Sequence, residues 1–202
     1  AAPAFAVLQP EAGVVLADRA LAAFARGLEI REGSAVESVD ELDADAVVVA
    51  AGAWVNDLVR PPLEVRITRE TVCYFAIAGD RPVPAVVAFK PDTHGHLFYA
   101  LPDPVHGLKV GAHHEGREAD PNEPAEPDPG LVERIAAWTR ERFVLDAPEP
   151  VAAQTCLYTT TPDESFVLER RGRVVVCSAC SGHGFKFAPA IGARVAALVA
   201  AG

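Results

Sequence analysis

The chain has 202 residues, half of them apolar, which is enough for one large domain or two small ones with a sizeable core. Its 18 basic and 28 acidic residues give a net charge of -10, which argues against a nucleic-acid or anionic-membrane partner. The sequence contains no apolar stretch of about 20 residues and opens without a basic signal-peptide segment, so we expect a soluble cytoplasmic protein.

The N-terminal part of the chain mixes short helices and strands. Residues 18–26 are predicted to form a helix, and residues 28–31 and 35–39 to form short strands. The β-branched run at 45–52 ends in glycine and is typical of a strand that is buried on both faces. A helical turn is expected to follow at 53–55.

Apolar and polar residues alternate in the middle of the chain. The longest stretch, 63–78, favours a long strand because side chains alternate between the two faces of a sheet. The pattern continues at 85–89, 96–101 and 108–112, with proline and glycine in the turns. These segments predict an antiparallel meander. A loop rich in proline and acidic residues follows at 118–130, and then a helix at 131–143 with Leu131, Ile135 and Trp138 at helical spacing.

The C-terminal part returns to strands and ends in a helix. Strands are predicted at 151–158, 165–168 and 174–177. The last helix is expected to start near Pro189, which suits a first helical turn, and to bury Ile191, Val195 and Leu198. The pattern therefore indicates an α+β fold with a mostly antiparallel sheet and flanking helices.

Cysteine and histidine residues leave one alternative open. The four cysteines, Cys73, Cys156, Cys177 and Cys180, do not form a dense disulfide framework. Cys177 and Cys180 make a C-x-x-C pair, which suits a redox couple or half a metal site. Five histidines lie close together in sequence: His94, His96, His106, His113 and His114. Such pairs are frequent by chance, so a metal-binding module is the least favoured hypothesis.

A dinucleotide-binding loop of the G-x-G-x-x-G kind does not occur in this sequence. The nearest pattern is Gly182-His183-Gly184, where Phe187 stands in place of the third glycine. Composition and periodicity alone therefore do not indicate a dinucleotide cofactor.

Four segments carry a family resemblance. They are VVVAAGAW at 47–54, GLKVGAH at 107–113, TCLYTTTPD at 155–163 and SGHGFKF at 181–187. The last two are the most specific. Together the segments resemble the amine-oxidising branch of the D-amino-acid-oxidase superfamily, which includes monomeric sarcosine oxidase, N-methyltryptophan oxidase and pipecolate oxidase. The resemblance covers nearly the whole chain.

The resemblance implies a division of the chain into two parts. Residues 1–62 and 151–202 would be the remaining part of an FAD-binding α/β domain. Residues 63–150 would form a substrate-binding domain with an antiparallel sheet. The N-terminal βαβ unit of the family, with its glycine loop, has no counterpart in this sequence.

The resemblance also implies residue roles. Cys156 matches the cysteine that bonds the 8α-methyl group of the flavin, and a thiolate is a good nucleophile for that carbon. Lys109 matches a lysine near flavin N5 that promotes the reaction with O₂, since a positive charge stabilises reduced oxygen species. Lys186 would bind the substrate carboxylate. His113, Tyr99 and Tyr158 match residues that line the amine pocket.

Further cofactor contacts are implied at both ends of the chain. Gly52 and Trp54 match the end of the FAD domain strand. The second set is the turn Gly182, His183, Gly184, Phe185 and Lys186, whose glycines let the backbone approach the flavin ring.

The implied activity is oxidation of a secondary or N-methyl amino acid to an imine, with O₂ reduced to H₂O₂. The alternative is a non-catalytic fragment or a split subunit that needs a complementary N-terminal chain, because the phosphate-binding loop is missing.

Overall fold

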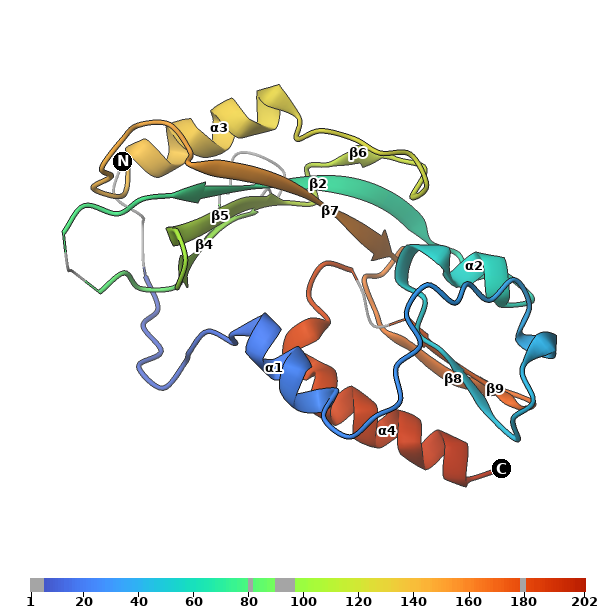
Figure 1. Cartoon of the computed structure of the whole chain (residues 1–202). Coiled ribbons are helices and arrows are strands. Elements are labelled where there is room, and N and C mark those ends of the chain that lie inside the picture. Colours follow the sequence, from blue (N-terminus) through green and yellow to red (C-terminus); the bar gives the residue numbers. More distant parts are fainter. Residues whose placement is uncertain (1–5, 80–81, 90–96, 179–180) are drawn as a thin grey trace.

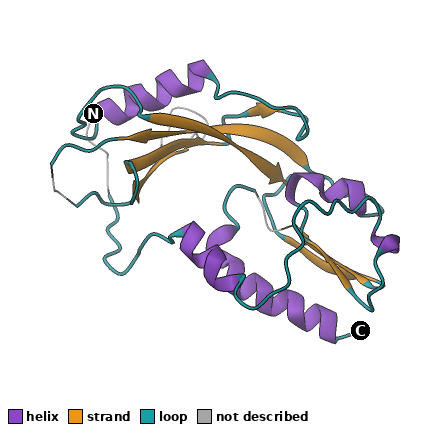
Figure 2. Cartoon of the chain, in the orientation of Figure 1, coloured by secondary structure: helices purple, strands orange, loops and turns teal. Residues whose placement is uncertain are grey.

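In the computed structural model of the protein, which describes residues 6–79, 82–89, 97–178 and 181–202, the chain forms two β-sheets with helices packed on them (Figures 1 and 2). The larger sheet lies between α3 (Pro129–Arg140) on one side and the smaller sheet with α1 (Ala17–Phe24) and α4 (Ala188–Ala200) on the other (Figure 1). The predicted α+β fold with a mostly antiparallel sheet is confirmed.

The larger sheet has six strands in which every pair is antiparallel. Its order is β3-β4-β5-β2-β6, and β7 also pairs with β2. The strands are β2 (Arg66–Phe75), β3 (Val86–Phe89), β4 (Leu97–Asp103), β5 (Gly107–His113), β6 (Arg117–Glu118) and β7 (Ala152–Thr160). The predicted meander is present only for β3, β4 and β5. The first predicted strand, β2, pairs with β5 and β7 instead of β3 and is the central strand of the sheet.

One face of this sheet is closed by α3. Asp128 caps the helix by accepting hydrogen bonds from the amides of Gly130 and Leu131, and Pro129 occupies its first turn. Trp138 of α3 stacks on Phe98 of β4, with ring centroids 5.2 Å apart. Ile135 is completely buried beneath the helix. Burial of these apolar side chains stabilises this layer most strongly.

The smaller sheet joins the two ends of the chain. β1 (Val47–Val49) runs parallel to β9 (Val174–Ser178), which pairs with β8 (Val167–Arg171) in the antiparallel sense. A second apolar core forms around Val47, Val49, Val55, Val59 and Val176. The short helices are η1 (Val39–Glu41), η2 (Gly52–Trp54), α2 (Val55–Leu58) and η3 (Phe185–Phe187), of which η1 and α2 contribute to this core.

Three local predictions are wrong. Residues 28–31 and 35–39 are not strands, and Leu28 and Ile30 are 67% and 61% exposed, because no neighbouring strand pairs with them. β1 is buried on only one face, since Val48 points to solvent. Ile191, Val195 and Leu198 of α4 are only half-buried, and α4 has no fully buried residue.

The division of the chain at residue 151 stays a prediction. β7 begins just after this position and pairs with β2 along nine residues. This pairing favours a boundary that follows β7, at the turn into β8.

The lengths and hydropathies of the described helices bear on whether the chain crosses a membrane. Within the described ranges, every helix is too short or too polar to cross a bilayer.

Candidate active site

Strand register places the predicted site residues on one face of the larger sheet. Directly paired residues of antiparallel strands point to the same face, and residues two apart on a strand do so as well. Lys109 of β5 pairs with Tyr74 of β2, and Gly111 pairs with Tyr99 of β4. His113 follows at the same parity. Tyr99, Lys109 and His113 therefore share a face.

The partner strand β7 extends the same face. Glu70 of β2, which has the parity of Tyr74, pairs with Cys156, and Thr68 pairs with Tyr158. The residues of opposite parity, such as Phe98, Val110 and Cys73, belong to the core beneath α3. The site face is thus the one that faces away from α3.

A hydrogen-bonded cluster forms at one end of this face. His113 Nδ1 and the hydroxyl of Tyr158 lie 3.2 Å apart, and the two rings meet edge to face. Tyr158 is also hydrogen bonded to Tyr99. Tyr99 crosses over Gly111, where a Cβ atom would lie 2.5 Å from its hydroxyl, so a larger residue there would displace the Tyr99 ring. The structure brings these three predicted residues together.

The glycine turn closes onto the cluster from the C-terminal part of the chain. The amide of Ser181 donates to the carbonyl of Thr159, at the end of β7, over 2.8 Å. Gly182 has a φ of 72°, and a Cβ atom on it would lie 2.1 Å from Tyr158 and 2.7 Å from His113. Glycine is required here by both backbone conformation and space.

The rest of this turn is held by its own backbone. His183 donates from Nδ1 to the carbonyl of Ser181, and Lys186 donates from Nζ to the carbonyl of His183, both over 2.8 Å. Gly184 precedes η3 with an ordinary φ of -73°. Lys186 and Phe185 are exposed.

Burial and charge set the protonation states of the cluster. Burial, reinforced by the nearby His114, His183 and Lys186, lowers the pKa of His113 to about 4, although Glu164 opposes the shift. Burial also raises the pKa values of Tyr99 and Tyr158. At neutral pH the site therefore presents a neutral imidazole and two protonated phenols.

Cys156 lies on the same face next to a cation. Its side chain is exposed on β7. Desolvation by surrounding atoms raises the pKa of the thiol, the charge of Lys109 lowers it, and the charge of Glu70 raises it. Lys109 is also 6.0 Å from the ring of Tyr74.

Gly52 and Trp54, the other two predicted cofactor contacts, belong to η2 and not to the strands of the site face. Gly52 has a φ of 55° and opens η2. The indole of Trp54 donates to Oδ1 of Asn122, in the loop after β6, over 2.8 Å. η2 lies beside β7.

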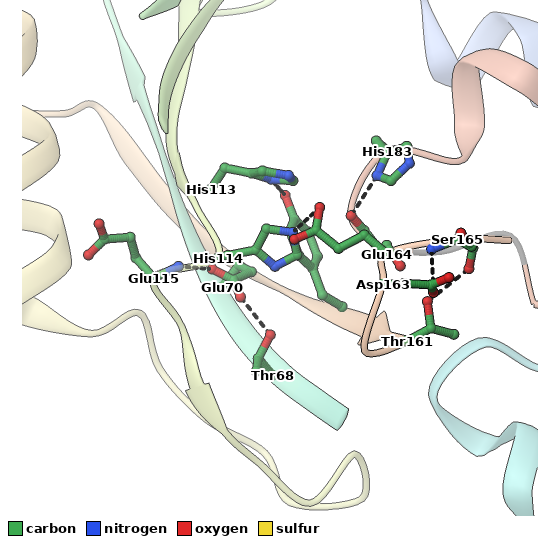
Figure 3. Close-up of polar contacts among 12 residues, drawn as sticks. Thr68, Glu70, His113, His114, Glu115, Thr161, Asp163, Glu164, Ser165 and His183 are labelled. Carbon is green, nitrogen blue, oxygen red and sulfur yellow. Dashed lines mark hydrogen bonds and ion pairs between the residues drawn. The ribbon is translucent and has the colours of Figure 1, made fainter. Parts of the chain in front are cut away.

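Three polar residues of the site were missed by sequence reasoning. Glu70 is a carboxylate buried on β2. His114 and Glu164 both have positive φ, at 57° and 59°, and His114 Nε2 lies 3.7 Å from Glu164 Oε2 (Figure 3). Ser181, which opens the SGHGFKF segment already noted in the sequence, also has a positive φ, of 51°. Non-glycine residues with positive φ are frequent at functional sites, but no pattern in the sequence predicts them.

The described side chains do not form a group that could hold a metal ion. Among the residues that the structure describes, no three histidine, cysteine or acidic side chains are grouped to hold an ion. His94, His96 and Cys180 lie outside those residues.

Comparison with known proteins identifies the family. The family described as DAO, FAD dependent oxidoreductase, matches residues 3–198. The peroxisomal sarcosine oxidase of Homo sapiens is 29% identical, with 92% of this chain and 56% of the relative covered. A probable sarcosine oxidase of Arabidopsis thaliana is 35% identical (89% and 48% covered). The N-methyl-L-tryptophan oxidase of Yersinia pestis (strain Pestoides F) is 34% identical (78% and 44% covered).

Solved structures agree with this assignment. NikD, an amino acid oxidase of nikkomycin biosynthesis, superposes with a TM-score of 0.64 at 27% identity, over 76% of this chain and 44% of NikD. The fructosamine oxidase Amadoriase II from Aspergillus fumigatus shares the fold, with a TM-score of 0.62 at 19% identity over 78% of this chain and 42% of its own. The chain spans about half the length of the curated relatives that it matches. By the family match along nearly its whole length, the chain belongs to the DAO family of FAD dependent oxidoreductases.

Proposed function

We propose that this chain forms the substrate-facing part of a flavin-dependent amine oxidase. The substrate would be a secondary or N-methyl amino acid, oxidised to an imine while O₂ is reduced to H₂O₂. The observation that carries the proposal is the shared sheet face of Tyr99, Lys109, His113, Cys156 and Tyr158. The names of the sarcosine and N-methyl-L-tryptophan oxidases support the substrate class.

The residues present fit the ring end of a flavin. Cys156 offers an exposed thiol on the site face, and the Gly182 turn brings backbone close to that face without a side chain. We propose that Cys156 Sγ would hold the flavin through a thioether to its 8α carbon, with the S–H and one methyl C–H bond broken and the two electrons passing to the flavin and then to O₂. Residues 182–186, with Gly52 and Trp54, would complete the contacts. When bound, the flavin accepts the two electrons of the amine and passes them to O₂.

The chain's own residues would bind and orient the amine and supply the positive charge that favours the reaction with O₂. A neutral His113, hydrogen bonded to Tyr158, does not repel an ammonium group and can accept a proton. Tyr99 and Tyr158 stay protonated and frame the pocket as hydrogen-bond donors. Lys109 supplies the positive charge that favours reduction of O₂ beside the Cys156 thiol.

Lys186 is proposed to bind the substrate carboxylate. Its ammonium group is exposed, lies in the turn that contacts His113, and contributes to the low pKa of that histidine. A second positive charge at this edge of the site suits an anionic carboxylate.

A second candidate follows from one sequence observation. The chain contains no G-x-G-x-x-G loop, so the phosphates of FAD need donors from outside these residues. The chain would then be a non-catalytic fragment or a split subunit that binds flavin only with a complementary N-terminal chain.

One experiment separates these candidates and tests the attachment residue. The purified chain is incubated with FAD and precipitated in acid, and the pellet is examined for flavin absorbance. Colour that survives in the wild type and in Cys73→Ser, but not in Cys156→Ser, would support attachment at Cys156. Colour retained by Cys156→Ser would refute it. A chain that binds no flavin in any form would favour the split subunit.

A further inference from the structure

The carboxylate of Glu70 is the most deeply buried charged group on the site face. The residue is 1% exposed. It accepts hydrogen bonds from the hydroxyl of Thr68 at 2.6 Å and from the amides of Glu115 at 3.1 Å and Gly116 at 2.8 Å (Figure 3). All three donors are neutral, so no cation in this set offsets the buried charge.

The two amides come from an irregular stretch that follows the predicted site histidine. The β2–β5 ladder ends where Val72 pairs with Gly111, and pairing resumes as β6 where Arg69 meets Arg117. The chain between Gly111 and Arg117 is three residues longer than the stretch of β2 that it faces. His113 still pairs with Leu97 of β4. The residues that follow it, 114–116, form a bulge against β2, and bulges re-aim side chains beside active sites. Glu70 takes the place of the missing ladder acceptors.

The bulge is also held from the opposite face of the sheet. The carboxylate of Glu115 pairs with Arg134 of α3, and Glu115 raises the pKa of that guanidinium through a hydrogen bond. Gly116 fits closely, because a Cβ atom there would lie 2.2 Å from the carbonyl oxygen of Arg69 and 2.7 Å from Glu70. The stretch is therefore clamped between a buried carboxylate and a helix.

Packing alone does not explain a carboxylate at this position. Desolvating a charge costs several kcal/mol, and an apolar side chain of similar volume is often as stabilising or more so. The hydrogen bonds of Glu70 all go to β2 itself or to the bulge. We infer that Glu70 is a positioning residue, which holds the amides of Glu115 and Gly116 and thereby fixes His113 against Tyr158 and Gly182.

The importance of this placement for catalysis rests on the proposed role of His113, but the placement itself does not. Two substitutions separate the position of Glu70 from its charge. Glu70→Gln removes the charge, yet its amide oxygen can accept both backbone amides and its NH₂ can donate to Thr68. Glu70→Ala removes the anchor as well. A bulge released from β2 would let the imidazole of His113 move into water.

Histidine NMR titration of the folded chain measures this movement without flavin. The groups that act on His113 are Tyr158, His114, Glu164, His183 and Lys186. In the wild type and in Glu70→Gln we expect His113 to titrate near 4, and in Glu70→Ala to titrate closer to its ordinary 6.5. A pure charge effect has the opposite sign, because removing a negative charge lowers the pKa of a histidine. The spectrum of His113→Gln assigns the signal.

Two results would overturn the inference. One is a folded Glu70→Ala protein in which His113 still titrates near 4. The other needs no variant and decides the matter if Glu70→Ala does not fold: wild-type amides of Glu115 and Gly116 that exchange hydrogen as fast as those of the surface loop at 120–123. Slow exchange at both amides would support the anchor. Since neither measurement involves FAD, failure of the flavin-binding experiment leaves this test intact.

Discussion

Cys73 and Cys156 lie on neighbouring strands of the same sheet and meet opposite environments. Cys73 of β2 is completely buried beneath α3, and burial raises the pKa of its thiol to about 11. Cys156 of β7 is exposed beside Lys109, whose charge offsets part of the rise that desolvation causes in the pKa of its thiol. The register explains the contrast, because Cys73 pairs with Ala153, three residues and therefore one face away from Cys156. The sheet face to which a cysteine points therefore decides here whether its thiol is buried or accessible.

The same contrast separates the two faces as a whole. The α3 face is closed by aliphatic and aromatic side chains around the Phe98–Trp138 stack. The site face carries the histidines, the tyrosines and the buried Glu70, and the positive-φ residues His114, Glu164 and Ser181 lie near it. One face therefore supplies stability, while the other holds polar groups that contribute less to it. Substitutions on each face can test this difference.

The largest effect is expected on the α3 face. Trp138→Ala removes a stacked indole that is 5% exposed and should lower the free energy of unfolding by about 3–5 kcal/mol. Tyr99→Phe on the site face removes only a hydroxyl and should cost about 1 kcal/mol. Urea denaturation followed by far-UV circular dichroism measures both. Similar losses for the two variants would contradict the division between the faces.

Sequence periodicity predicted the α3 face well. The helical spacing of Leu131, Ile135 and Trp138 and the alternation along the meander are local signals, and the structure has a helix and strands at those places. Where an expected strand lacked a partner, as at Leu28 and Ile30, the same local signal was misleading. A strand depends on its neighbour, which periodicity within one segment does not reveal.

The site face was only partly predictable. Family resemblance named Tyr99, Lys109, His113, Cys156 and Tyr158, and the structure places all five on one face. Glu70 was not found, because its role depends on a bulge formed 45 residues later in the chain. His114 and Glu164 were missed as site residues because backbone strain has no signature in residue type alone.

A second prediction concerns the two cysteines directly. At pH 7.5, iodoacetamide should modify Cys73 more slowly than Cys156 by about a hundredfold, because complete burial blocks access to Cys73 and raises its pKa to about 11, whereas Cys156 is exposed and Lys109 offsets part of the rise in its pKa. Peptide mass spectrometry after timed alkylation gives both rates. Cys156→Ser is the control that assigns the fast phase, and a fast phase that persists in this variant would show that the register argument fails.

A third prediction uses the histidine of the site face. The pKa of His113 is about 4 in the folded chain and 6.5 ordinarily, so between these values the unfolded chain binds a proton that the folded chain does not. The free energy of unfolding should therefore fall as the pH drops from 6.5 towards 4. Allowing for solvent screening at a half-buried group, the loss should be about 1–2 kcal/mol.

Urea denaturation at pH 7 and pH 5 measures this effect. Replacement of the imidazole in His113→Gln should remove its share of the pH dependence, because glutamine does not titrate. His106→Gln is a matched control at the far end of β4, where the ring contacts Asp103 and Tyr74. An unchanged pH dependence in His113→Gln would show that His113 is solvated rather than held against Tyr158.

The smallest effect is expected from the charge that distinguishes the two thiols. Lys109→Met keeps a long side chain at the position but removes the positive charge that lowers the pKa of Cys156. At a fixed pH below that pKa, less thiolate forms, and alkylation of Cys156 should slow by about threefold to tenfold. The rate for Cys73 should not change, since burial alone raises its pKa. Arg31→Met, which removes an exposed charge paired with Glu29, should leave both rates unchanged. If Lys109→Met did the same, the reactivity of Cys156 would come from exposure alone, and Lys109 would be free to act on another group of the site face.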